Sequence, residues 1–225
     1  MTTNSVPPIP SNSSAHPSPR PRGIAYYVID IILNLAIIAG VVFVVRTFVV
    51  SPFQIDGSSM VDTLENRQYI VINKFRYLFR TPSRGEVVVF RPPVAEDKYY
   101  VKRVIGIPGD TVVIRKGLVF FRDPIAKKDI QIEEPYLNKH NAGKTYKAPV
   151  NGGDTSEVIF VVPEGQYFLM GDNRQGSQDS RSFAISSSHA SAFVPRKNIN
   201  GSVWFVALPI SKIHALEPAV YSNIK

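Results

Sequence analysis

The stretch 99–121, Tyr-Tyr-Val-Lys-Arg-Val-Ile-Gly-Ile-Pro-Gly-Asp-Thr-Val-Val-Ile-Arg-Lys-Gly-Leu-Val-Phe-Phe, contains three runs rich in β-branched and aromatic residues. Pro-Gly-Asp and Lys-Gly separate the runs, and such residues are typical of turns between strands. Similar runs occur on both sides of this stretch. We expect strands at 68–73, 86–90, 99–105, 111–114, 118–121, 158–162, 166–170 and 202–207. Short strands at this spacing predict a mainly β domain, an antiparallel sandwich or barrel.

The chain before this domain has a different composition. Residues 1–23 contain six prolines with several Ser and Asn, which predicts a disordered tail. Residues 24–50 are mostly apolar and long enough for a membrane span of about 20 residues. A cleaved signal peptide and a buried core helix are the alternatives, but residues 44–50 lack the small-x-small site of a signal peptide. We therefore expect a transmembrane anchor at 24–50.

The distribution of arginines predicts the orientation of this anchor. Arg20 and Arg22 precede it, whereas Arg46 is followed by no further basic residue until Arg67. Positive charge favours the cytoplasmic side, so we expect a cytoplasmic tail and an extracytoplasmic β-rich domain at 51–225. Within this domain, the polar stretch 123–155 is expected to be a surface insertion with one short strand.

Composition excludes several classes of function. The chain has 225 residues and no Cys, so disulfides, thiol catalysis and Cys-based metal sites are ruled out. The net charge is +8, but Lys and Arg are spread along the chain without a basic block. We expect a preference for a membrane surface at most, and no nucleic-acid partner.

A serine and a lysine are the candidates for chemistry. A serine is a weak nucleophile until a base takes its proton, and none of the four histidines lies in a recognisable motif. Lys102 lies inside an apolar run, where burial would lower its pKa enough for it to act as that base. From the pattern alone, a solvent-facing lysine and a simple turn at Ser58-Ser59 stay open, and neither serine is favoured.

A dense polar loop at 171–181 is the third candidate region. Its sequence is Gly-Asp-Asn-Arg-Gln-Gly-Ser-Gln-Asp-Ser-Arg, with acidic and basic residues alternating. These charges could form buried ion pairs or lie on a solvated loop. The spacing of the acidic residues does not fit a Ca²⁺-binding loop, so no metal is expected.

Four ordered segments together resemble the type I signal peptidases. Their nucleophile motif, Gly-x-Ser-Met-x-Pro-Thr-Leu, corresponds to Gly57–Leu64, which reads Gly-Ser-Ser-Met-Val-Asp-Thr-Leu. The other three matching segments are Arg84–Phe90, Tyr100–Asp110 and Gly171–Arg181. The resemblance covers the chain from Phe53 to Ile213, together with the anchor.

The resemblance implies a membrane-anchored serine endopeptidase that removes signal peptides from exported preproteins without a cofactor. Its fold would be the antiparallel β-sandwich or barrel-like type shared with self-cleaving repressor proteases, behind one N-terminal transmembrane helix. Ser59 would be the nucleophile, Lys102 the general base and Ser177 the residue that orients the lysine amine. Ion pairs would shape the site between the following residues: Asp172 with Arg103, and Asp179 with Arg181.

Further expectations concern substrate and oxyanion binding. Gly57 and the backbone N–H of Ser59 are expected at the oxyanion site. The expected lining of shallow pockets for small side chains is Ile55, Met60, Tyr100 and Val104. Asp62 stands where the family usually has proline, and its charge would oppose catalysis near Lys102, so we expect it to point away.

The expected partners are signal peptides and the lipid bilayer of the cell membrane, and a contact with the export machinery stays open. Two alternatives to signal-peptide cleavage also stay open. One is a self-cleaving Ser–Lys regulator, against which the anchor argues. The other is an inactive or non-enzymatic membrane-tethered β-domain, which the substitution at Asp62 leaves open.

Overall fold

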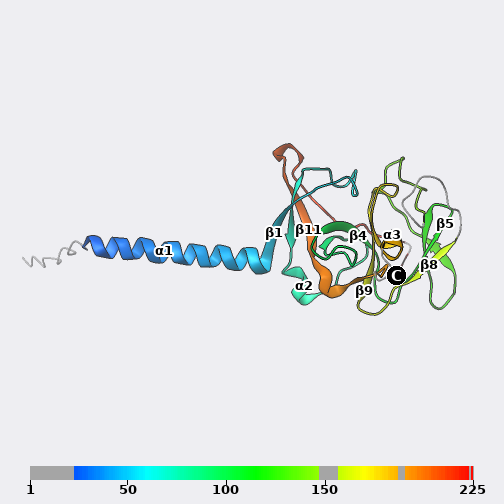
Figure 1. Cartoon of the computed structure of the whole chain (residues 1–225), viewed down its shortest axis with the longest axis horizontal. Coiled ribbons are helices and arrows are strands. Elements are labelled where there is room, and N and C mark those ends of the chain that lie inside the picture. Colours follow the sequence, from blue (N-terminus) through cyan, green and yellow to red (C-terminus); the bar gives the residue numbers. More distant parts are fainter. Residues whose placement is uncertain (1–22, 147–156, 187–190, 223, 225) are drawn as a thin grey trace, which may run out of the picture. The chain divides into compact units, whose positions relative to one another are not determined.

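A computed structural model describes residues 23–146, 157–186, 191–222 and 224 (Figure 1). Apart from Gly23, the tail predicted for 1–23 lies outside these residues. The helical elements are α1 (Ile24–Val44), a π-helical turn (Val45–Val49), α2 (Arg76–Phe79), α3 (Ser180–Ser186) and two 3₁₀ turns (Arg196–Asn198, Ile210–Lys212). The strands are β1 (Val50–Gln54), β2 (Tyr69–Asn73), β3 (Val87–Phe90), β4 (Tyr100–Gly106), β5 (Thr111–Arg115), β6 (Leu118–Arg122), β7 (Asp129–Gln131), β8 (Val158–Val161), β9 (Gln166–Met170), β10 (Val194–Pro195), β11 (Ile199–Leu208) and β12 (His214–Ala215).

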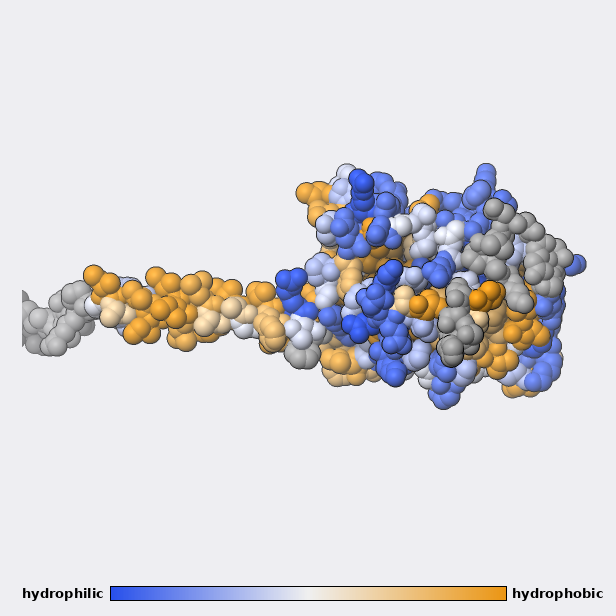
Figure 2. All heavy atoms as spheres, viewed as in Figure 1, coloured by the Kyte–Doolittle hydropathy of each residue, from blue (hydrophilic) through white to orange (hydrophobic). Residues whose placement is uncertain are grey.

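The N-terminal helix is apolar on all sides. Figure 2 shows hydrophobic residues over most of the visible face of this helix, and none of the residues of α1 is buried. A helix with this surface needs an apolar environment, and the segment Ile24–Thr47 is long enough to cross a membrane. The segment predicted as anchor, 24–50, ends slightly earlier in the structure, because Val50 already pairs with Asn73 as the first residue of β1.

A large antiparallel sheet forms one layer of the domain. Its strand order is β1-β2-β11-β3-β4-β9-β10, with β12 paired to β11. All four residues of β3 are buried, which explains why this central strand reads as a continuous apolar run rather than an alternating one. In β2, by contrast, Ile70 and Ile72 are buried while Tyr69 is exposed, so one face of this part of the sheet points inward.

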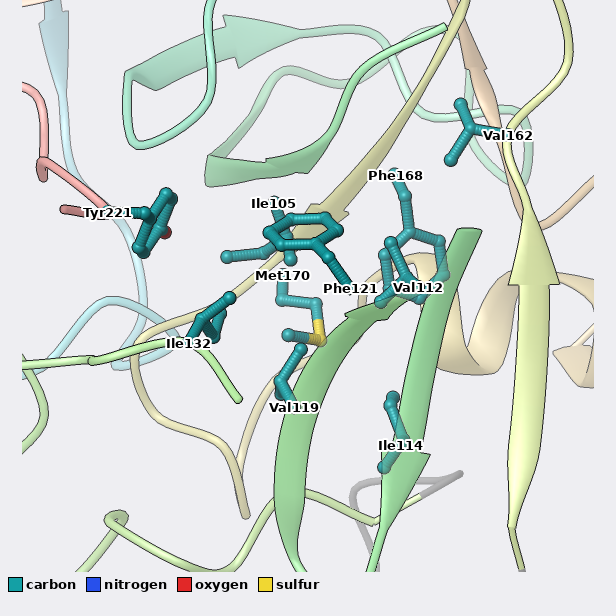
Figure 3. Packing of buried hydrophobic residues seen from close by; sticks show 10 residues of the cluster. All are labelled: Ile105, Val112, Ile114, Val119, Phe121, Ile132, Val162, Phe168, Met170 and Tyr221. Carbon is teal, nitrogen blue, oxygen red and sulfur yellow. The ribbon is translucent and has the colours of Figure 1, made fainter. Parts of the chain in front are cut away.

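A second, four-stranded sheet in the order β7-β6-β5-β8 packs against the first through a common hydrophobic core. Figure 3 shows the side chains of this core, which come from β4, β5, β6 and β9, from Ile132 and Val162 just after β7 and β8, and from Tyr221 near the C-terminus. The mainly antiparallel β architecture predicted from the sequence is confirmed, as are the eight predicted strands to within a few residues. The short elements α2, α3, β1, β10 and β12 were not predicted.

The stretch 123–155 is only partly the surface insertion expected from the sequence. It holds the expected short strand, β7, while residues 147–156 lie outside the described part. However, Ile132, Asn141 and Thr145 are buried. Thr145 also forms a β-bridge with Gly117, so the described part of the stretch packs into the domain.

We predict that Gly85→Ala lowers the free energy of unfolding more than Gly109→Ala does. Both glycines have positive φ, 82° and 87°, so both substitutions carry the same backbone strain. At Gly85 a Cβ would also lie 2.0 Å from the carbonyl oxygen of Ala219, whereas Gly109 has open space. Chemical denaturation of both variants measures the difference, and equal losses would contradict the predicted close approach.

Candidate active site

The side chain of Lys102 is buried at the middle of β4, with a relative exposure of 3%. Its Nζ lies 2.7 Å from Ser59 Oγ and 2.9 Å from the carbonyl oxygen of Val101. The Tyr100 ring covers the amine, with the ring centroid 5.3 Å from Nζ. The lysine and serine singled out from the sequence, which are 43 positions apart, are thus brought into direct contact.

Burial is the main influence on the charge of this lysine. It lowers the pKa of Lys102 from 10.5 to about 8, although the carboxylates of Asp179 and Asp172 act in the opposite direction. With a pKa of about 8, roughly a tenth of the amine is neutral at pH 7 and can accept a proton. An ordinary surface lysine would have only about 0.0004 of its amine in this form.

Ser59 lies in a turn that follows β1, within residues 55–64, which we call the nucleophile loop. Gly57 begins the turn with φ of 112°, a conformation that favours glycine. Asn173 fixes the turn from outside, since its N–H donates to the Ser59 carbonyl at 3.1 Å and its Nδ2 to the Ser58 carbonyl at 3.1 Å. Ser58 is exposed, whereas Ser59 is partly buried and faces Lys102, which separates the two serines.

Gly57 and Ser59, the two residues expected at the oxyanion site, differ in the state of their backbone N–H groups. The backbone N–H of Gly57 donates to Asn66 Oδ1 at 3.0 Å, so this group is already engaged. Among the described residues, the N–H of Ser59 donates to no acceptor. The expected donor at Ser59 therefore stays available, while Gly57 serves the conformation of the turn.

Ser177 is buried beside the nucleophile loop. A Cβ on Gly171 would lie 2.2 Å from Ser177 Oγ and 2.5 Å from the Ser59 carbonyl oxygen, so these groups surround the bare glycine. The Ser177 hydroxyl makes no hydrogen bond of normal geometry within the described part of the chain, although it helps Arg181 to lower the pKa of Asp179. The hydrogen bond to Lys102 implied by the family resemblance is thus not formed in this structure, in which the amine contacts Ser59 and Val101.

Two buried ion pairs flank the dyad in the predicted combinations. Arg103 donates to Asp172 at 2.9 and 2.6 Å, and Thr63 adds a third hydrogen bond to this carboxylate at 2.5 Å. Arg181 donates to Asp179 at 2.9 and 2.7 Å. Burial would raise the pKa of Asp179, but the charge and hydrogen bonds of Arg181 outweigh it, so the pKa is lowered and the carboxylate stays ionised.

A third ion pair joins Arg174 to Glu134. Arg174 is fully buried and also donates to Thr145 Oγ1 at 2.6 Å and to the Gly171 carbonyl at 3.1 Å. Tyr136, two residues after Glu134, lies under the Arg103 guanidinium, with the Arg103 Cζ 3.9 Å from the ring centroid. This partner was not predicted from the sequence, because Glu134 lies in a polar stretch that shows no periodicity.

An open groove of about 540 Å³ runs past the dyad. Its lining includes Ile55, Met60 and Tyr100 of the four predicted pocket residues. Val104, the fourth, is fully buried in a separate core with Phe90, Leu169 and Phe183, in the part of β4 that pairs with β9. Strand alternation alone could not show at which residue β4 passes from the groove into the hydrophobic core.

Asp62 points toward a different part of the domain, as expected. Its carboxylate accepts a hydrogen bond from Asn138 Nδ2 at 2.6 Å and does not line the groove. Asp62 also does not contribute to the pKa of Lys102, which responds to Asp179 and Asp172.

Comparisons with known proteins identify the family of this chain. A family model described as "Signal peptidase, peptidase S26" matches residues 28–208. The chain is 33% identical to signal peptidase IB of Staphylococcus aureus (strain COL), over 87% of this chain and 98% of the relative. It is 34% identical to signal peptidase I S of Bacillus subtilis (strain 168), over 79% of this chain and 89% of the relative.

A crystal structure of a signal peptidase I from Enterococcus faecalis is similar, with 28% identity over 55% of this chain and 97% of that chain. Its TM-score is 0.40, too low for a conclusion about the fold. The family match and the two relatives extend over most of the sequence. The chain therefore belongs to the signal peptidase family, peptidase S26, and is a serine endopeptidase that removes signal peptides.

Proposed function

We propose that Ser59 is the nucleophile and Lys102 the general base with which this peptidase cuts signal peptides. The observation that carries the proposal is the 2.7 Å contact between Lys102 Nζ and Ser59 Oγ, made by a lysine that is almost completely buried. This distance is within hydrogen-bond reach, as proton transfer requires. The lowered pKa supplies the neutral amine.

The reaction begins when neutral Lys102 takes the proton of Ser59 Oγ, which attacks the carbonyl carbon of the scissile bond. The N–H of Ser59 donates to the developing oxyanion. The Lys102 ammonium then protonates the leaving amine, and an acyl-enzyme ester forms at Ser59. In the second half, neutral Lys102 takes a proton from water, which hydrolyses the ester and restores the serine. Ser177, whose buried hydroxyl also lies near enough to Asp179 to lower the pKa of that carboxyl, would orient the amine during these transfers.

The groove supports binding of the substrate as an extended segment. On one side lies the end of β1, an outer strand that pairs only with β2. On the other side lies the start of β4, where Tyr100–Lys102 pairs with β3 but is not covered by β9. A peptide can add to such exposed strand edges. The apolar side chains Ile55, Met60 and Tyr100 would then contact small side chains before the scissile bond.

The proposal also covers the location and the membrane orientation of the enzyme. The apolar helix α1 and the family membership indicate a membrane-anchored enzyme. The arginines before α1 favour a cytoplasmic N-terminus in the cell membrane, with the domain from Val50 onward on the extracytoplasmic side. There it would meet signal peptides of exported preproteins within the bilayer, and contacts with the export machinery would be favoured by this location.

We expect Ser59→Ala and Lys102→Met each to lower the cleavage rate of a preprotein by several orders of magnitude, because each removes one half of the dyad. Ser58→Ala is the matched control, since the exposed neighbouring hydroxyl faces no base, and it should keep activity within a few-fold. Cleavage by the full-length enzyme in detergent micelles is the measurement. Substantial activity in Ser59→Ala would refute the assignment.

The rate should depend on pH in the direction that a neutral lysine requires. Because the pKa of Lys102 is about 8, kcat/KM should rise about tenfold per pH unit below pH 7 and level off above pH 8. The measurement uses a short peptide substrate under conditions in which chemistry limits the rate. A profile that is flat from pH 5 to 9 would be incompatible with a lysine base.

The lowered pKa of Lys102 should also reduce the stability of the folded state at neutral pH. The folded state binds a proton on Lys102 less readily than the unfolded state does, so this residue destabilises the fold below pH 8, and the effect vanishes as pH rises past 10.5. Lys102→Met should therefore raise the free energy of unfolding at pH 7 by up to about 3 kcal/mol. Denaturation at pH 7 and at pH 10 tests this, and an equal effect at both pH values would contradict it.

A further inference from the structure

The two catalytic loops meet at the backbone of the nucleophile. The loop 171–181, which we call the charged loop, holds the nucleophile loop through the two hydrogen bonds from Asn173 to the carbonyls of Ser58 and Ser59. These bonds fix the backbone on the Ser59 side. Beyond Met60, the nucleophile loop is also joined to the charged loop by the hydrogen bond from Thr63 Oγ1 to Asp172 Oδ2 at 2.5 Å.

A third segment touches both loops. Residues 134–145, which we call the bridging segment, follow β7 and lie far from both loops in sequence. Asn138 Nδ2 donates to Asp62 Oδ2 in the nucleophile loop at 2.6 Å. Gln175 in the charged loop donates through Nε2 to the His140 carbonyl at 2.7 Å. The bridging segment therefore joins the two loops by a second route.

The orientation of the Asn138 amide is set by its own turn. Its Oδ1 accepts hydrogen bonds from the backbone N–H of Asn141 at 2.9 Å and from Asn141 Nδ2 at 3.2 Å. Asn141 is buried, so this end of the amide is held in place. The Nδ2 end consequently faces the Asp62 carboxylate, and a hydrogen bond to a charged acceptor is about twice as strong as a neutral one.

Both ends of the bridging segment are held by contacts with Arg174. Glu134 at its start forms the ion pair with the fully buried Arg174, and Thr145 at its end accepts a hydrogen bond from the same guanidinium. Arg174 itself belongs to the charged loop. A contact with Asp62 from this segment therefore restrains the nucleophile loop against a fixed part of the site.

We propose that Asp62 and Asn138 form a positioning pair that keeps Ser59 Oγ within hydrogen-bond reach of Lys102 Nζ. The proposal rests on the dyad proposed above. At this position the family usually has proline, which restricts the backbone by its ring. Asp62 has no such restriction, and its hydrogen bond to Asn138 supplies a restraint from outside the loop. The pair makes no contact with the groove, so it acts on the rate of chemistry rather than on binding.

The test begins with single and double substitutions in the full-length enzyme. Asp62→Ala and Asn138→Ala should each lower kcat on the order of tenfold and leave KM within twofold, because small displacements of a nucleophile are costly. The double variant should be no slower than the slower single variant, because each substitution removes the same hydrogen bond between Asp62 and Asn138. Losses that multiply in the double variant, or full activity in Asn138→Ala, would overturn the proposal.

A carboxylate–amide exchange separates positioning from a general effect on folding. Asn138→Asp places two carboxylates face to face and should lower kcat further than Asn138→Ala does. Combined with Asp62→Asn it restores the hydrogen bond and keeps an acceptor for Asn141, so kcat should return to within threefold of the wild-type value. Failure of this rescue in a variant with wild-type thermal stability would count against a positioning role.

Two controls complete the experiment. Asn198→Ala removes another exposed amide, one that donates to the Arg91 carbonyl at 3.1 Å outside the site, and should leave kcat unchanged. Ser59→Ala tests the dyad independently. If Ser59→Ala is inactive while Asn138→Ala is fully active, the positioning proposal fails and the proposed function stands. If Ser59→Ala is active, the dyad itself is wrong.

Discussion

The burial of the Lys102 amine away from water is the constraint around which the rest of the site is arranged. Lys102 can act as a base only because burial disfavours its charged form, and the same burial works against folding at neutral pH. The amine is therefore placed where many other interactions support the structure. It lies on β4, an inner strand of the large sheet, and its neighbours on the chain are part of two hydrophobic cores.

The charges around the amine are organised so that they do not cancel this effect. Asp172 and Asp179 would each stabilise an ammonium, but each carboxylate is held by an arginine at two points. Arg174 is similarly held by Glu134. Buried ions without partners would cost several kcal/mol each, so these pairs are best understood as a way to surround the lysine with fixed polar groups whose charges are already neutralised.

The sequence predicted the scaffold well, and the candidate site in part. The strands were predictable because runs such as Val87–Phe90 combine β-branched residues with clear turn signals. Ser59 and Lys102 could be paired only through the resemblance to a family, since each is ambiguous alone. Local patterns did not show contacts between distant segments, such as Glu134 with Arg174 or Asn138 with Asp62. They also placed Val104 in the groove, because alternation gives the face of a strand but not the point where a neighbouring strand covers it.

Strand β4 is divided along its length, which limits the polypeptides that the site can accept. From Arg103 onward it is flanked by β3 and β9, whereas Tyr100–Lys102 has a neighbour on one side only among the described strands. Unpaired strand edges invite association with other chains, and a short edge keeps this risk small. The same shortness makes the edge selective by conformation. In the proposed binding mode, helical or folded polypeptides cannot pair with this edge, and a preprotein has to present a few locally unwound residues at the cleavage site.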